Sequence, residues 1–119
     1  MSTEEKILKL VEGLLAKTKS GDVVWERTSS PDVFQAAFPS YTVRVSTRRS
    51  ENQLEALDYV VSILDEAGTT IERASDVDLT KALGGVSAYQ LMQELYALAR
   101  RQALGVDGAL DTLLSELSR

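Results

Sequence analysis

The chain has 119 residues, enough for one domain, and its 13 basic and 18 acidic side chains give a net charge of −5. Because cysteine and histidine are both absent, disulfides, thiolate zinc sites, cysteine nucleophiles and histidine-based catalysis are excluded. We therefore expect no enzyme, no cofactor and no metal site, and the acidic balance argues against nucleic-acid binding.

A helix is predicted at the start of the chain. Ser2 and Glu5 have the spacing of a capping box, apolar residues recur at helical spacing as far as Leu15, and Gly21 follows as a terminator. These first residues lack the pattern of a signal peptide, and no apolar run is long enough to cross a membrane. We therefore expect a cytoplasmic protein without a membrane partner.

Apolar and polar residues alternate between Asp22 and Ser46, which predicts three strands. Pro39 cannot adopt the positive φ of a tight primed turn, so a four-residue loop over Phe38–Tyr41 is expected between the second and third strands. The loop and the apolar pattern together fix the pairing. The expected neighbours across the sheet are Phe34 and Val45, Gln35 and Arg44, and Glu26 and Gln35.

Two further strands are expected after a loop over residues 47–52. Residues 53–56 could form a helical turn instead, and strand is favoured from Leu57 onward. Gly68 suits the left-handed position of a type I turn with a bulge. A three-residue loop there would place Ile63 opposite Ile71.

Three helices are predicted in the remainder of the chain. Ser75 begins a short helix that extends to Leu83, and Ser87 begins a second capping box for a helix that Gly105 ends. Asp107 is the expected cap of the last helix.

The order of these elements predicts an α+β fold in a single domain over residues 1–119. It comprises an N-terminal helix, a five-stranded antiparallel meander and three C-terminal helices packed on one sheet face. For a compact chain of this length the radius of gyration would be roughly 13–14 Å.

Several stretches of the chain match a known group of sequences. They are Leu14-Leu15-x-Lys17-Thr18-x-x-Gly21-x-x-x-Trp25, Phe34-x-Ala36-x-Phe38, Tyr41-x-Val43-Arg44-Val45-Ser46 and Leu95-Tyr96-x-Leu98-Ala99-Arg100-Arg101-x-Ala103-Leu104-Gly105. In these stretches the chain resembles short uncharacterised prokaryotic α+β proteins. The resemblance implies no activity, cofactor, partner or functional residue.

Polar side chains follow one face of the third predicted strand. Arg44 and Ser46 share this face, and Gln35 is expected beside Arg44. Arginines suit anion binding, so the candidate ligand-binding residues are Gln35, Arg44, Ser46, Arg48 and Arg49. The alternative is a solvated sheet face with a cross-strand polar ladder, which the alternation favours.

The helix before Gly105 is apolar around more than half of its circumference. It is therefore expected either to be buried between the sheet and the last helix or to present one side to a partner. The candidate interaction surface comprises Tyr89, Tyr96 and Arg100. The leading hypothesis is a non-catalytic protein-interaction or accessory module that binds another protein or itself as a homodimer. The alternative is a small module that binds an anionic ligand through the arginine-bearing sheet face.

Overall fold

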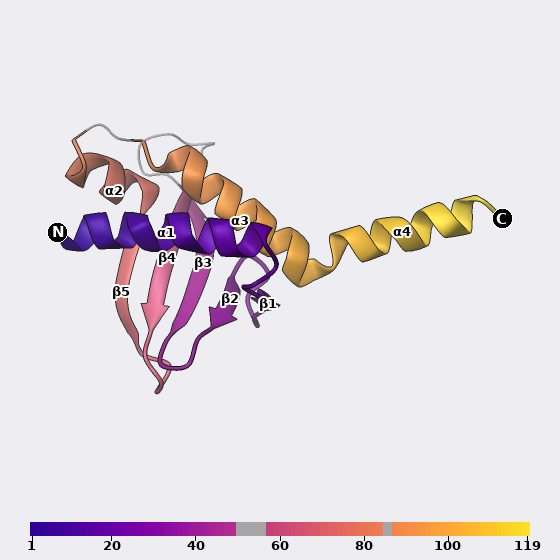
Figure 1. Cartoon of the computed structure of the whole chain (residues 1–119), viewed down its shortest axis with the longest axis horizontal. Coiled ribbons are helices and arrows are strands. Elements are labelled where there is room, and N and C mark those ends of the chain that lie inside the picture. The colour runs from indigo at the N-terminus through magenta and orange to yellow at the C-terminus, as the bar shows by residue number, and fades with distance from the viewer. Residues whose placement is uncertain (50–56, 85–86) are drawn as a thin grey trace.

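The computed structural model describes residues 1–49, 57–84 and 87–119. The elements in chain order are α1 (Thr3–Lys19), β1 (Glu26–Arg27), β2 (Phe34–Ala37), β3 (Thr42–Arg49), β4 (Leu57–Leu64), β5 (Thr70–Ser75), α2 (Asp76–Ala82), α3 (Tyr89–Leu104) and α4 (Val106–Leu117). The strands form one antiparallel sheet in the order β1-β2-β3-β4-β5 (Figure 1). The predicted α+β class and order of elements are confirmed. The expectations for residues 50–56 lie outside the described residues.

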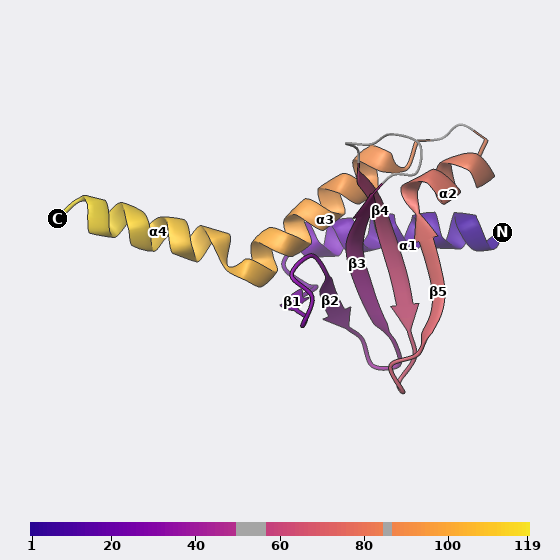
Figure 2. The same ribbon diagram turned by 180° about the vertical axis from the view of Figure 1, so that it is seen from behind.

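The core lies on one face of the sheet. α1 and α3 run across this face, and α2 packs at the end of β4 and β5 (Figure 1). Phe34 and Val61 of the sheet join Val11 of α1 and Leu95 of α3 in one buried cluster. In the part of the chain that the structure describes, no helix covers the opposite face (Figure 2). The molecule is therefore a two-layer structure with one open sheet face.

The predicted pairing of the central strands is confirmed. The Phe38 amide donates to the Tyr41 carbonyl at 2.8 Å and closes the four-residue loop. Phe34 pairs with Val45, Gln35 pairs with Arg44, and Glu26 pairs with Gln35. Because side chains alternate along a strand, this register places the apolar residues of β2 and β3 on the core face and their polar residues on the open face.

The first strand is shorter than the alternation predicted, because residues 22–25 are not in the sheet. The Trp25 amide donates to Oε1 of Gln102 at 2.6 Å, and the Gln102 side-chain nitrogen donates to the Val23 carbonyl at 3.3 Å. A side chain of α3 therefore satisfies backbone groups that a neighbouring strand would otherwise pair. Val23 and Trp25 are nevertheless buried, as their spacing indicated.

Two further strand predictions are corrected. β3 continues to Arg49, which pairs with Leu57, although a loop was expected from residue 47. Ile63 pairs with Glu72 rather than with Ile71, because a bulge adds one residue to β5. The turn itself is as predicted, with Gly68 at a φ of 83°.

The predicted start of α3 is wrong, whereas the capping box at Ser2 and the helix start at Ser75 are confirmed, and Ser75 also forms a capping box with Asp78. The N-cap of α3 is Ala88, which makes no side-chain capping bond. Ala88 is fully buried, and its amide donates to the Thr80 hydroxyl at 3.2 Å. A residue of α2 therefore accepts the hydrogen bond of the backbone amide at the start of α3.

α4 does not join the helical layer. It follows α3 after a single residue, Gly105, whose φ of 65° is left-handed, and it projects away from the sheet (Figure 1). Asp107 consequently lies inside the first turn and is not the cap. The radius of gyration is 15.7 Å and the longest extent is 55 Å, both larger than a compact chain would have.

Candidate functional site

A row of polar residues crosses the open face of the sheet. Gln35, Arg44, Ser62 and Arg73 are successive partners on β2, β3, β4 and β5. Nε of Arg44 donates to Oε1 of Gln35 at 3.0 Å, so the predicted polar ladder is present. Ser62 and Arg73 were missed, because the place of Ser62 depends on the pairing of β3 with β4 and that of Arg73 on the register of β5. The three-residue loop predicted the register of β4 and β5, but the bulge shifts that register by one residue.

The five predicted ligand-binding residues do not all lie together. Gln35, Arg44, Ser46 and Arg48 lie on the open face, whereas alternation along β3 places Arg49 on the other face. Nε of Arg48 lies 3.4 Å from Oδ2 of the buried Asp58. This carboxylate already balances the charge of Arg48.

Two arginines on the open face are candidates for binding a ligand. Among the described residues, Arg44 and Arg73 form no ion pair. They flank Ser62 in a shallow depression of about 330 Å³ that Ser46 and Thr70 also line. Two guanidinium groups beside hydroxyl groups have the chemistry of an anion site.

The predicted interaction surface on α3 is largely used inside the molecule. The Tyr96 ring packs against Phe34 and Tyr59, with centroids 5.7 and 5.5 Å apart, and its hydroxyl donates to the Asp32 carbonyl at 2.9 Å. Burial raises the pKa of the Tyr96 hydroxyl, as the charge of Asp32 also does. Tyr89 and Arg100 are exposed, with the Tyr89 ring 5.6 Å from that of Tyr59. Tyr96 is therefore part of the packing and not a free contact.

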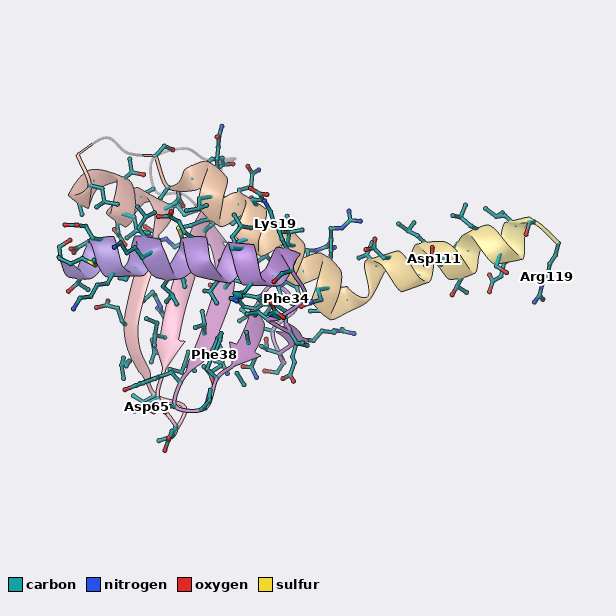
Figure 3. The ribbon with its side chains drawn as sticks, in the orientation of Figure 1. Lys19, Phe34, Phe38, Asp65, Asp111 and Arg119 are labelled. Atoms are coloured by element: carbon teal, nitrogen blue, oxygen red, sulfur yellow. The ribbon has the colours of Figure 1, made fainter. Side chains whose placement is uncertain are left out.

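An apolar groove lies on the core face, where the strands extend beyond the helices. It has a volume of about 390 Å³ and is lined by Leu10, Phe38, Tyr41, Val43, Ile63 and Ile71. Figure 3 shows Phe38 over the lower part of the sheet, beyond α1, whereas Phe34 lies close to the end of α1. Phe38, Tyr41 and Ile71 are 41%, 50% and 54% exposed. Alternation predicts which face these residues occupy, but it does not predict how far the helices extend over that face.

α4 carries a second apolar surface. Its leucines recur at the spacing i, i+3, i+4 and i+7, and they are Leu110, Leu113, Leu114 and Leu117, which we call the leucine stripe. Their exposed fractions run from 48% to 80%, and no residue of α4 is buried. The helical repeat places Asp111 and Glu116 on either side of this stripe. An amphipathic helix with its apolar side in water lacks the contact that normally stabilises it.

Comparison with known proteins yields no relative: no family model, no curated protein and no solved structure matches the chain. Over the described ranges, no helix is long and apolar enough to cross a bilayer. Over the same ranges, no group of three carboxylates is placed to hold a metal ion. The two apolar surfaces and the polar row are therefore the features of the molecule that point to a function.

Proposed function

We propose that this chain is a non-catalytic protein-interaction module that acts in the cytoplasm and self-associates. The observation that carries this proposal is α4, which projects from the body with its leucine stripe exposed. The lack of histidine and cysteine supports a non-catalytic role, because it removes the commonest catalytic bases and nucleophiles.

The energetics of α4 favour a partner. A separate helix of this length is marginal in water, whereas burial of each leucine side chain contributes roughly 1.5–3 kcal/mol. Contiguous apolar surface of this kind is typical of interaction sites. The exposed groove on the sheet adds a second apolar surface to the same molecule.

Light scattering during size-exclusion chromatography tests the proposal. The chain should elute at twice its mass of 13.0 kDa, and Leu113→Glu should return it to one chain because a charge replaces a leucine in the centre of the stripe. Thr112→Glu is the matched control, since the neighbouring residue lies on the polar side of α4 and should leave the dimer intact. A wild-type mass of one chain at high micromolar concentration would refute the proposal.

A second candidate function, anionic-ligand binding, is favoured by the polar row. Arg44 and Arg73 lie on either side of Ser62 and form no ion pair within the described ranges. Two such cations can hold an oxyanion more tightly than a single surface arginine.

Thermal unfolding with inorganic pyrophosphate or nucleoside triphosphates tests this second function. A ligand at a hundredfold excess over its Kd should stabilise the fold by about 2.7 kcal/mol. Arg44→Ala and Arg73→Ala should abolish the shift in Tm, whereas Arg49→Ala, on the other face of β3, should retain it. A shift that survives both of the first two changes would place the ligand elsewhere.

A further inference from the structure

The chain exposes two apolar surfaces, the groove on the sheet and the leucine stripe on α4. Building on the proposed self-association, we propose that α4 of one copy docks in the apolar groove of a second copy, and that the exchange is reciprocal. The leucine stripe would then cover Phe38, Tyr41 and Ile71, the most exposed residues of the groove. A reciprocal exchange gives a closed dimer with two equivalent seats.

Charge supports a second copy as the occupant. The helical repeat places Lys6 and Lys17 on the same side of α1 as Leu10, and Lys9 and Lys17 line a depression continuous with the groove through Leu10 and Phe38. Lys17 lies 3.9 Å from Asp22. The opposite edge is acidic, with Glu72 on β5 and with Asp65 and Glu66 in a depression continuous with the groove through Phe38 and Tyr41. The basic part of the rim is therefore the edge along α1. α4 presents Asp111 and Glu116 beside its leucines. Docked along α1, the acidic sides of α4 would therefore face the lysines at that edge of the groove.

The junction between α3 and α4 favours a groove on another copy. Gly105 is the only residue between the two helices, and Nη2 of Arg101 lies 2.9 Å from Oδ1 of Asp107 across it. The contact spans the junction in the arrangement in which α4 points away from its own body, and Figure 3 shows Asp111 well separated from Phe38. Short connections of this kind promote exchange between copies rather than folding back.

Cross-linking tests the proposed seat, since the wild-type chain contains no cysteine. Ile71→Cys and Leu114→Cys are prepared as separate full-length chains, one with a tag that changes its mass, and mixed under mild oxidation. We expect a covalent dimer that contains one chain of each kind. Thr112→Cys replaces Leu114→Cys in the matched control, and it should cross-link to Ile71→Cys at least about tenfold more slowly because it lies on the polar side of α4.

The other outcomes distinguish this inference from the proposed function. If Leu114→Cys chains cross-link mainly to one another, two α4 helices pair directly. This result would refute docking of α4 in the groove but would leave self-association intact. If a chain with both cysteines closes on itself as a monomer, α4 folds back into its own groove and the exchange is refuted. A wild-type mass of one chain refutes both proposals. Fluorescence of Trp25 verifies that each variant is folded, and Phe38→Cys substitutes for Ile71→Cys if that variant is not.

Discussion

At the scale of single residues, a short chain of hydrogen bonds attaches residues 23–25 to the helices. Nε1 of Trp25 donates to the Thr18 hydroxyl at 2.9 Å, and that hydroxyl donates to the Leu14 carbonyl. On the other side, Gln102 bonds the backbone of Val23 and Trp25. Trp25 is only 2% exposed, so its indole nitrogen has no access to water if this acceptor is lost.

We predict that Thr18→Val costs about 1–3 kcal/mol of unfolding free energy, because it leaves a buried donor without an acceptor. The change is nearly isosteric, so packing is otherwise preserved. Urea unfolding followed by the fluorescence of Trp25, the only tryptophan, measures it. Thr112→Val on exposed α4 should change stability by less than about 0.5 kcal/mol. Equal losses in both variants would show that the Trp25 bond contributes nothing.

A second feature at this scale is a buried carboxyl group. Asp76 is 5% exposed, and its Oδ1 accepts from the Tyr59 amide at 2.8 Å. Burial raises its pKa above the ordinary value of 3.8 more than the Tyr59 bond lowers it, and the neighbouring charge of Asp58 adds to the rise. The folded protein therefore resists ionisation of Asp76 more than the unfolded chain does.

We predict from this shift that Asp76 lowers stability as the pH rises from 3.8 through its raised pKa, because the unfolded chain ionises first. Asp76→Asn stays neutral and keeps an oxygen for the Tyr59 amide. The unfolding free energy of the variant minus that of the wild type should therefore increase across this window and then level off. Urea unfolding at a series of pH values measures the difference. A difference independent of pH would contradict the prediction.

At the scale of elements, the junctions between helices are set by individual residues. Gly105 adopts a φ of 65° after α3, where a Cβ is strained, whereas Gly13 lies inside α1 and an added Cβ would meet no atom within 4 Å. Two glycines of the same chain thus have opposite conformational demands.

We predict that Gly105→Ala destabilises the protein by about 1–2 kcal/mol, because alanine is disfavoured in the left-handed region. Gly13→Ala should stabilise it by about 0.5–1 kcal/mol, because it removes glycine from a helix interior. Thermal unfolding of both variants provides the comparison. Shifts of Tm in the same direction would contradict this assignment of the two glycines.

The elements also show which features of the fold can be predicted from the sequence. The pairing of Gln35 with Arg44 was predictable because Pro39 and the flanking apolar residues restrict the loop. The absence of strand at residues 22–25 was not, because its cause, Gln102, lies 77 residues from Trp25. The bulge in β5 before Glu72, the partner of Ile63, was also not predictable. Only part of the polar row could therefore be predicted. Local patterns define elements, and distant contacts decide where they end.

At the scale of the whole molecule, the chain is an α+β body with one extended helix. The sequence pattern predicted α4 but not its exposed position, because an amphipathic helix shows the same periodicity whether it packs on its own chain or on another. The same limit applies to the groove, whose residues have the alternation of a covered strand. Exposed α4 and the exposed groove together account for the proposed dimer.

Hydrogen exchange of the amides in α4 tests self-association most directly. A twelve-residue helix without a partner is marginal in water, so its protection should depend on the docked copy. We predict that the amides of residues 106–117 are protected at high protein concentration and lose protection on dilution, while those of the buried turns of α3 remain unchanged. Exchange from α4 that is equally fast at every concentration would contradict the account.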